Sequence, residues 1–329
     1  MKTAIFSTKF YEKKYLLEVN DEAGHELSFF DDALKIESVH LAMGFDAVSI
    51  LMHDKVDKVT LEALAKMKVR LIALRCAGYD NVDLEAAAKF HIKVVRVPAY
   101  SPQSVAEHAI ALILTLNRKT HKAFNRTRAN NFTLQNLMGF NLYGKTVGVV
   151  GTGNIGTAFC NIMLGFGCKV IANDINHSPA LEEKGVRYMP FLELLEESDI
   201  VSVHCPLQNS TRHLFNSLSF SRLKRGAMLI NTARGGIINT EDLIIALKSG
   251  QVGYLGMDVC ENEGQIFNID FTDRIVEDDN IARLLSFNNV LVTPHQGYFT
   301  NEAVLEISKT TIRNLSDFEN GFPLQNEIS

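Results

Sequence analysis

Three ionisable residues come within a few positions of the end of an apolar, strand-like run: Arg234, Glu263 and His295. Parallel strands present their ligand-binding groups at one shared edge of a sheet, beyond their carboxyl ends. Three such residues could therefore act together. Each also has an ordinary explanation, since loop Arg and Glu residues are usually solvated charges and a histidine after a proline is more often structural.

The three side chains have complementary chemistry. His295 could move a proton near neutral pH, because an unperturbed imidazole has a pKa of about 6.5. Glu263 could orient the imidazole ring. Arg234 offers a planar fork that suits bidentate binding of a carboxylate. This combination fits reduction of a carbonyl next to a carboxylate, provided that a cofactor supplies the hydride.

A glycine motif indicates that cofactor. Gly151, Gly153 and Gly156 follow an apolar strand and open a helix-like stretch. In a dinucleotide-binding fold the first glycine allows a tight turn, the second lets the backbone approach a pyrophosphate, and the third lets helix and strand pack closely. Asp174 ends the next strand, where a carboxylate can hold the ribose hydroxyls and repel a 2′-phosphate. An ordinary β-turn is the alternative, but the strand, the helix and the acid together favour NAD.

Strand-like and helix-like segments alternate along most of the chain, which predicts an α/β fold with parallel sheets. In the first hundred residues the clearest helix is 60–67, with Thr60 as its expected N-cap. Pro102 introduces a strongly apolar helix that opens a second unit. That unit contains the glycine motif and is complete by Thr293, so the last helix, 301–319, is expected to return to the first unit.

We therefore predict two doubly wound parallel-sheet domains with the active site in the cleft between them. A Rossmann NAD-binding domain is expected at residues 101–299. A flavodoxin-like substrate (catalytic) domain is expected from residues 1–100 and 300–329.

Composition narrows the classes of partner. The chain has 329 residues, typical of about two domains, and a net charge of −5, which disfavours a nucleic-acid surface. Its five cysteines are scattered without a CxxC pair, so neither a disulfide framework nor a metal site is expected. No signal-peptide segment and no apolar run of bilayer length is found, and a cytoplasmic protein without a membrane partner is expected.

The motifs together resemble the D-specific 2-hydroxyacid dehydrogenases over essentially the whole chain. The matching segments are Gly151-Thr-Gly-Asn-Ile-Gly156, Asp174, His204-Cys-Pro-Leu207, Asn231-Thr-Ala-Arg-Gly235, Gly256-Met-Asp-Val259, Glu263, Thr293-Pro-His-Gln296 and residues 72–83 and 95–102. The resemblance implies an NAD-dependent oxidoreductase that reduces a small 2-oxo acid, pyruvate first, to the D-hydroxy acid. It also implies a homodimer or homotetramer built through the cofactor domain.

The resemblance further implies roles for single residues. Arg234 would bind the substrate carboxylate, and His295, paired with Glu263, would be the acid/base. Substrate contacts would also come from Ala77, Gly78, Tyr100, Tyr298 and Phe299, the first two through backbone N–H groups. Cofactor contacts would come from Gly151, Gly153, Asn154, Ile155, Gly156, Asp174, Cys205, Pro206, Thr211, Thr232, Ala233, Arg234 and Asp258.

Two alternatives remain at this point. A bulkier 2-oxo acid could be the substrate, although aromatic residues in the expected pocket favour a small one, and one methylene is worth only about 1–3 kcal/mol of discrimination. A non-enzymatic NAD-sensing binding protein, of the kind found among C-terminal-binding-protein corepressors, is the second. We expect this one less, because the chain has no Pro/Ser-rich tail after its last helix.

Overall fold

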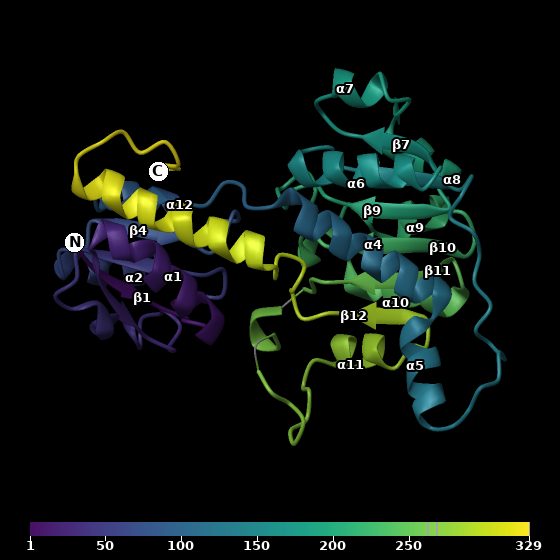
Figure 1. Cartoon of the computed structure of the whole chain (residues 1–329), viewed down its shortest axis with the longest axis horizontal. Helices are drawn as coiled ribbons and strands as arrows, with labels where there is room; N and C mark the ends of the chain where they lie inside the picture. Colours follow the sequence, from purple (N-terminus) through teal and green to yellow (C-terminus); the bar gives the residue numbers. More distant parts are fainter. Residues whose placement is uncertain (262, 268, 329) are drawn as a thin grey trace. The chain divides into compact units, whose positions relative to one another are not determined.

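The computed structural model describes residues 1–261, 263–267 and 269–328, and the chain divides into two compact units. The first unit comprises residues 1–101 together with the chain from Phe299 onward, and the second comprises Pro102–Tyr298. Each unit is an α/β domain built on its own parallel sheet (Figure 1).

The sheet of the first unit has five parallel strands in the order β2-β1-β3-β4-β5. This is the flavodoxin-like strand order, with its topological switch point between β1 and β3. The strands are β1 (Lys2–Ile5), β2 (Glu26–Phe29), β3 (Ala47–Ile50), β4 (Leu71–Leu74) and β5 (Lys93–Val95).

Helices cover both faces of this sheet, because alternate strand residues are apolar on each side. One face packs against α2 (Lys58–Lys66) and α3 (Leu84–Lys89), and the other packs against α1 (Phe10–Ala23) and α12 (Asn301–Glu319). A short 3-10 helix, η1 (Val39–Ala42), also contributes to the first face. In Figure 1 the C-terminal helix α12, in yellow, lies alongside α1.

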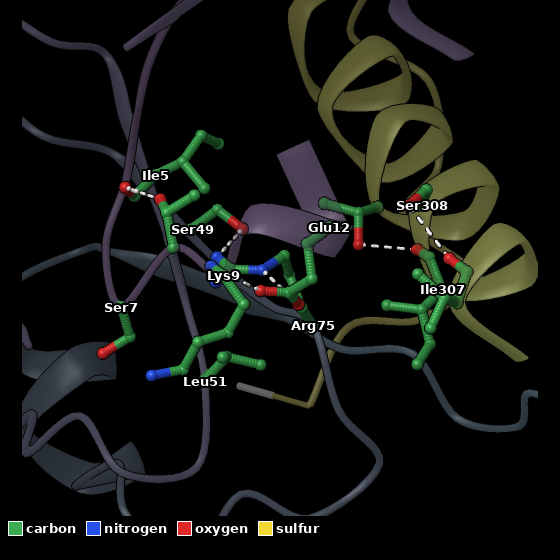
Figure 2. A network of polar contacts seen from close by, with 12 residues as sticks. Ile5, Ser7, Lys9, Glu12, Ser49, Leu51, Arg75, Ile307 and Ser308 are labelled. Carbon is green, nitrogen blue, oxygen red and sulfur yellow. Dashed lines mark hydrogen bonds and ion pairs between the residues drawn. The ribbon is translucent and has the colours of Figure 1, made fainter. Parts of the chain in front are cut away.

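A buried polar network ties the carboxyl ends of β1, β3 and β4 together. Arg75, directly after β4, is 2% exposed and donates to Glu12 (3.3 Å), to the Ser49 hydroxyl (3.1 Å) and to the Phe6 carbonyl (2.8 Å). Figure 2 shows the Arg75 guanidinium between Glu12 and Ser49. Because the ion pair is buried and hydrogen-bonded, it holds these strand ends in one arrangement.

The sheet of the second unit has seven parallel strands in the order β12-β11-β10-β9-β6-β7-β8. Its first six strands follow the Rossmann order, and the switch point lies between β6 and β9. The strands are β6 (Thr146–Val150), β7 (Lys169–Asn173), β8 (Arg187–Tyr188), β9 (Ile200–Val203), β10 (Ala227–Asn231), β11 (Val252–Met257) and β12 (Val290–Val292).

Two apolar cores cover the faces of this sheet. One lies under α4 (Pro102–Arg118), α6 (Asn154–Gly165) and α7 (Pro179–Glu182). The other lies under α8 (Phe191–Glu197), α9 (Ser217–Arg222), α10 (Thr240–Ser249) and α11 (Asp279–Leu285). The remaining elements are α5 (Thr120–Arg128) and the 3-10 helices η2 (Gly235–Ile237) and η3 (Glu263–Gln265).

The predicted fold class of two doubly wound parallel-sheet domains is confirmed. The predicted C-terminal helix at 301–319 has the observed bounds, and Gly250 ends α10 in the left-handed conformation. The expectation that Thr60 caps its helix is wrong. Asp57 is the N-cap, and its carboxylate accepts from the Thr60 N–H, because a carboxylate at this position satisfies a free N–H of the first turn.

Candidate active site

The candidate residues of the second unit collect at the carboxyl edge of its sheet. The Gly151 motif follows β6, Asp174 follows β7 and Cys205 follows β9, while Arg234, Asp258 and His295 follow β10, β11 and β12. All seven strands are parallel, so these six strand ends share one edge. The sequence placed each residue after a strand, and the structure aligns those strands side by side.

The glycine motif forms a tight turn pressed against the end of β9. Gly151 has φ +94, and a Cβ there would lie 2.6 Å from the Cys205 nitrogen. A Cβ on Gly156 would lie 2.0 Å from the Gly151 carbonyl oxygen, so helix and turn require both glycines. A Cβ on Gly153 would meet no atom within 4 Å. Gly153 therefore faces open space at the N-terminus of α6, where backbone N–H groups favour a phosphate.

Asp174 lies beside this turn and is already oriented by it. Its Oδ2 accepts from the backbone N–H and the hydroxyl of Thr152, and its Oδ1 accepts from the N–H of Asn176 at 2.9 Å. Partial burial alone would raise the pKa of Asp174, but these hydrogen bonds lower it below the ordinary value. The carboxylate thus stays ionised, as ribose binding and rejection of a 2′-phosphate require. The residues fit a dinucleotide.

Arg234 is set by the turn that follows β10. The buried Asn231 side chain donates to the Arg234 carbonyl at 2.9 Å and accepts from the Ala233 N–H at 3.0 Å. A Cβ on Gly235 would lie 2.0 Å from the carbonyl carbon of Cys260. The Arg234 turn therefore packs directly on the segment that leads to Glu263.

Glu263 and His295 are hydrogen-bonded to each other. The distance between His295 Nδ1 and Glu263 Oε1 is 2.9 Å, and Glu263 Oε2 accepts from the Cys260 N–H at 3.2 Å. Both side chains are mostly buried, at 14% and 17% exposure. An ionised carboxylate only accepts, so the hydrogen of this bond sits on Nδ1 and leaves Nε2 for chemistry.

His295 itself has a strained backbone with φ +54, which non-glycine residues rarely adopt. The Asp258 side chain supports this turn through hydrogen bonds. Its carboxylate is 2% exposed and accepts from the N–H groups of Gln296 (2.9 Å) and Gly297 (2.7 Å) and from the Thr293 hydroxyl (2.5 Å). The sequence associated Asp258 with the cofactor but did not reveal this support for the turn.

His108 is a residue that sequence reasoning missed. It lies on α4, where its Nε2 is 3.0 Å from the Thr293 hydroxyl and 3.3 Å from Asp258 Oδ1. Burial alone would raise the pKa of Asp258, but hydrogen bonds from His108 and Thr293 lower it. The only available signal in the sequence was a polar pair, Glu107-His108, in the middle of a largely apolar helix.

His204 was noted only as part of a motif. It is half-buried behind the glycine turn, where its Nε2 lies 2.8 Å from the Ser202 hydroxyl and its ring packs on Phe159. Burial lowers the pKa of His204 to about 3, so it stays neutral and supports the turn structurally.

The remaining cofactor candidates lie in the segments after β9 and β10. The Thr211 hydroxyl donates to the Pro206 carbonyl at 2.7 Å and fixes the loop after Cys205. Burial raises the pKa of the Cys205 thiol to about 11, so it carries no charge to a cofactor. Thr232 is buried, and its hydroxyl has no hydrogen-bond partner among the described residues.

The substrate candidates divide between the two units. Ala77, Gly78, Tyr100 and Phe299 belong to the first unit, whereas Tyr298 belongs to the second together with Arg234 and His295. Ala77 and Gly78 are half-buried in the loop after β4, and the Phe299 ring packs edge-on against Tyr11 at 4.5 Å between centroids.

No cluster of three or more His, Cys, Asp or Glu side chains in the described ranges could hold a metal ion. Among the described helices, none is both long and apolar enough to cross a membrane. All five cysteines are free thiols.

Comparison with known proteins supports the family suggested by the motifs. Residues 110–297 match the family model for the D-isomer specific 2-hydroxyacid dehydrogenase NAD-binding domain. The chain is 48% identical to the D-lactate dehydrogenase of Escherichia coli K12 over 328 residues, covering all of both chains. The apo structure of the E. coli enzyme aligns over the full length of both chains with a TM-score of 0.91 and 47% identity.

A cofactor-bound structure is also similar. The D-lactate dehydrogenase of Lactobacillus jensenii, solved with NAD+, aligns over the full length of both chains with a TM-score of 0.83 and 32% identity. The family match covers more than half of the chain, and its second unit is an NAD-binding domain. The Gly151 turn, Asp174 and the bonded pair of Glu263 and His295 thus belong to a member of the D-isomer specific 2-hydroxyacid dehydrogenase family.

Proposed function

We propose that this chain is an NAD-dependent D-lactate dehydrogenase that reversibly reduces pyruvate to D-lactate. The observation that carries the proposal is the hydrogen bond between His295 Nδ1 and Glu263 at the carboxyl edge of the NAD-binding domain. The Arg234 turn packs against the segment that holds Glu263. The names of its full-length relatives supply the substrate.

In the proposed reaction, bound NADH supplies the hydride that reaches the carbonyl carbon of pyruvate. His295 donates the proton from Nε2 to the carbonyl oxygen. Glu263 keeps the ring in one orientation and keeps the other hydrogen on Nδ1, so Nε2 remains the reactive nitrogen. In the oxidation direction the same nitrogen accepts the proton of the hydroxyl group.

Arg234 binds the substrate carboxylate in this proposal. A guanidinium fork can make two parallel hydrogen bonds to a carboxylate, which fixes the substrate in orientation as well as position. The Asn231 side chain is hydrogen-bonded to the Arg234 carbonyl and to the Ala233 N–H, so the backbone that carries the Arg234 guanidinium is fixed.

We further propose that the first unit is the substrate-binding domain. Its Ala77 and Gly78 N–H groups would complete the carboxylate site, and Tyr100 and Phe299, with Tyr298 of the second unit, would restrict the pocket to a small side chain. Bulky aromatic residues favour pyruvate over larger 2-oxo acids in such a pocket.

We also propose a cytoplasmic, fermentative role as a homodimer or homotetramer. Exposed apolar residues of the second unit support self-association, because large apolar side chains gathered in one segment mark interaction surfaces. They lie in α5 and in the segment between α5 and β6: Phe124 at 59%, Phe132 at 73%, Leu134 at 82%, Met138 at 87% and Tyr143 at 81% exposure. Light scattering coupled to size-exclusion chromatography measures the state directly.

The test of function follows NADH oxidation by its absorbance with pyruvate, 2-oxobutyrate, phenylpyruvate, hydroxypyruvate and 2-oxoisocaproate, and identifies the product by chiral analysis. We expect the highest kcat/KM with pyruvate and D-lactate as the product. A preference for a bulky 2-oxo acid would keep the reaction and reject the small pocket. Binding of NADH without reduction of any 2-oxo acid would refute the enzyme and favour a cofactor-sensing protein.

A further inference from the structure

The loop that follows β4 is anchored where it begins. Arg75 is buried and donates to Glu12 and Ser49 (Figure 2). It also donates to the Phe6 carbonyl, so the carboxyl end of the strand is held from three sides. The next residues, Cys76 to Tyr79, include Ala77 and Gly78, which carry the proposed substrate contacts. The Cys76 thiol donates to the Gly78 carbonyl at 3.2 Å and tightens the turn.

A second arginine holds the middle of this loop. Arg96, directly after β5, donates from Nη1 to the Ala77 carbonyl at 2.7 Å. Its guanidinium also lies over the Tyr79 ring, 5.2 Å from the centroid. A planar cation that both donates to a carbonyl and stacks on a ring is restricted in rotation as well as in position.

The backbone of Arg96 is itself fixed by the C-terminal part of the first unit. Its N–H donates to the Asn326 carbonyl at 3.1 Å, and its carbonyl accepts from the Asn314 side chain at 3.0 Å. The Asn326 side chain donates to Asn314 at 2.8 Å. The backbone that carries the Arg96 guanidinium is therefore held in place by these hydrogen bonds.

The Ala77 carbonyl and the Gly78 N–H belong to one peptide unit. No peptide bond in the described residues is cis, so the two groups point in opposite directions. By holding the carbonyl from one side, Arg96 aims the Gly78 N–H to the other side. Within the described residues this N–H makes no hydrogen bond, so it is available to a ligand. A charged donor on the carbonyl also polarises the peptide and strengthens its N–H as a donor.

We propose that Arg96 is a positioning residue that orients and polarises the Gly78 N–H for the substrate carboxylate. Arg96 acts through the peptide and does not touch the substrate. This role rests on the proposed function, because it assumes that the ligand of Gly78 is a 2-oxo acid. In this proposal Arg96 of the first unit contributes to substrate affinity, in addition to Arg234 of the second unit.

The test compares Arg96→Met and Arg96→Lys with a matched control. Arg70→Met removes another arginine of the same unit, whose guanidinium lies 5.5 Å from the centroid of the Phe318 ring. No side-chain contact of Arg70 reaches the loop after β4 in the described part of the chain. For each protein, kcat and KM for pyruvate are measured at saturating NADH, with the inhibition constant of the pyruvate analogue oxamate and the Kd of NADH.

We expect Arg96→Met to raise KM and the oxamate inhibition constant together by about tenfold, equivalent to about 1.4 kcal/mol, with kcat and NADH binding nearly unchanged. Arg96→Lys should recover part of this loss, since an ammonium can still donate to the carbonyl. Arg70→Met should match the wild type in every constant.

An unchanged KM and oxamate constant in Arg96→Met would overturn the proposal. A fall in kcat alone would also overturn it, because that result indicates general destabilisation. If Arg96→Met does not fold, the test rests on Arg96→Lys. A KM for pyruvate equal to that of the wild type in Arg96→Lys would then reject the role of Arg96. If the wild type reduces no 2-oxo acid, the proposed function fails first and this role falls with it.

Discussion

Replacing Asp258 by asparagine tests whether the buried carboxylate controls the turn that carries His295. In the wild type, Oδ1 accepts from Thr293 and Gln296, and Oδ2 accepts from Gly297. An asparagine has one oxygen and one NH2 group in these places. Either orientation of the amide therefore leaves a buried backbone N–H facing another donor.

The loss of stability in Asp258→Asn follows from this one buried N–H group without an acceptor. A buried donor without a partner costs about 1–3 kcal/mol. At about 2 kcal/mol the melting temperature of a domain of this size falls by roughly 4–8 °C. The N–H group that loses its acceptor belongs to Gln296 or Gly297, the two residues after His295. The backbone of His295 has φ +54 and depends on its surroundings to keep this conformation. A misplacement of about 1 Å at a reacting group can cost about a hundredfold in rate, so we expect kcat to fall by about 10–100-fold.

The loss of stability should depend on pH in a defined direction. Burial alone would raise the pKa of Asp258, but hydrogen bonds from His108, Thr293 and Gln296 lower it below the ordinary value. A carboxylate with a lowered pKa in the folded state stabilises fully above its unfolded pKa of about 3.9. That contribution disappears as the pH falls through the lower folded value. The stability difference between wild type and Asp258→Asn should thus be constant from about pH 5 to 7 and shrink below about pH 4.

The assay combines thermal melting across this pH range with kcat for pyruvate and the Kd of NADH. Asp199→Asn is a matched control, because Asp199 also accepts a backbone N–H, from Thr146, but lies at the amino end of the strands. It should lose stability and keep its kcat. If Asp258→Asn loses stability by a similar amount with an unchanged kcat, the carboxylate supports the fold alone and the reasoning about His295 is refuted.

Three further substitutions test the site. His295→Gln should lower kcat by about 10²–10⁴-fold, the usual contribution of an acid/base group, with normal NADH binding by fluorescence titration; near-normal turnover would remove His295 from that role. Arg234→Lys should reduce kcat/KM for pyruvate by about 10–100-fold, because one point charge replaces a bidentate fork, and an unchanged value would contradict carboxylate binding. Asp174→Asn should narrow the preference for NADH over NADPH in steady-state assays, and a mutant as selective as the wild type would count against the ribose role.

The fold class was predictable because its signals are local and repeated. Alternating apolar strands and helices specify a parallel sheet, and glycine at 151 and 156 is required by contacts that any Cβ would violate. The error at Thr60 also comes from relying on a local signal. Threonine and aspartate are both good N-caps, and only the backbone geometry shows that the helix begins three residues earlier, after Asp57.

The candidate site was predictable where a motif carries the chemistry, and less so where a contact crosses between distant elements. Glu263 and His295 lie in separate segments, yet both follow strands of one parallel sheet, so topology alone brings them to one edge. No comparable rule links His108 on α4 to Asp258, or Arg96 to the Ala77 carbonyl.

Those two contacts have a common feature that explains why the sequence conceals them. In each, a cationic or ring-nitrogen donor from one element reaches a loop after a strand of another, and the acceptor is a carboxylate or a backbone carbonyl. A backbone carbonyl leaves no trace in the sequence, because every residue has one. The groups proposed to touch the substrate are therefore readable as motifs, whereas the groups that hold them in place require the structure.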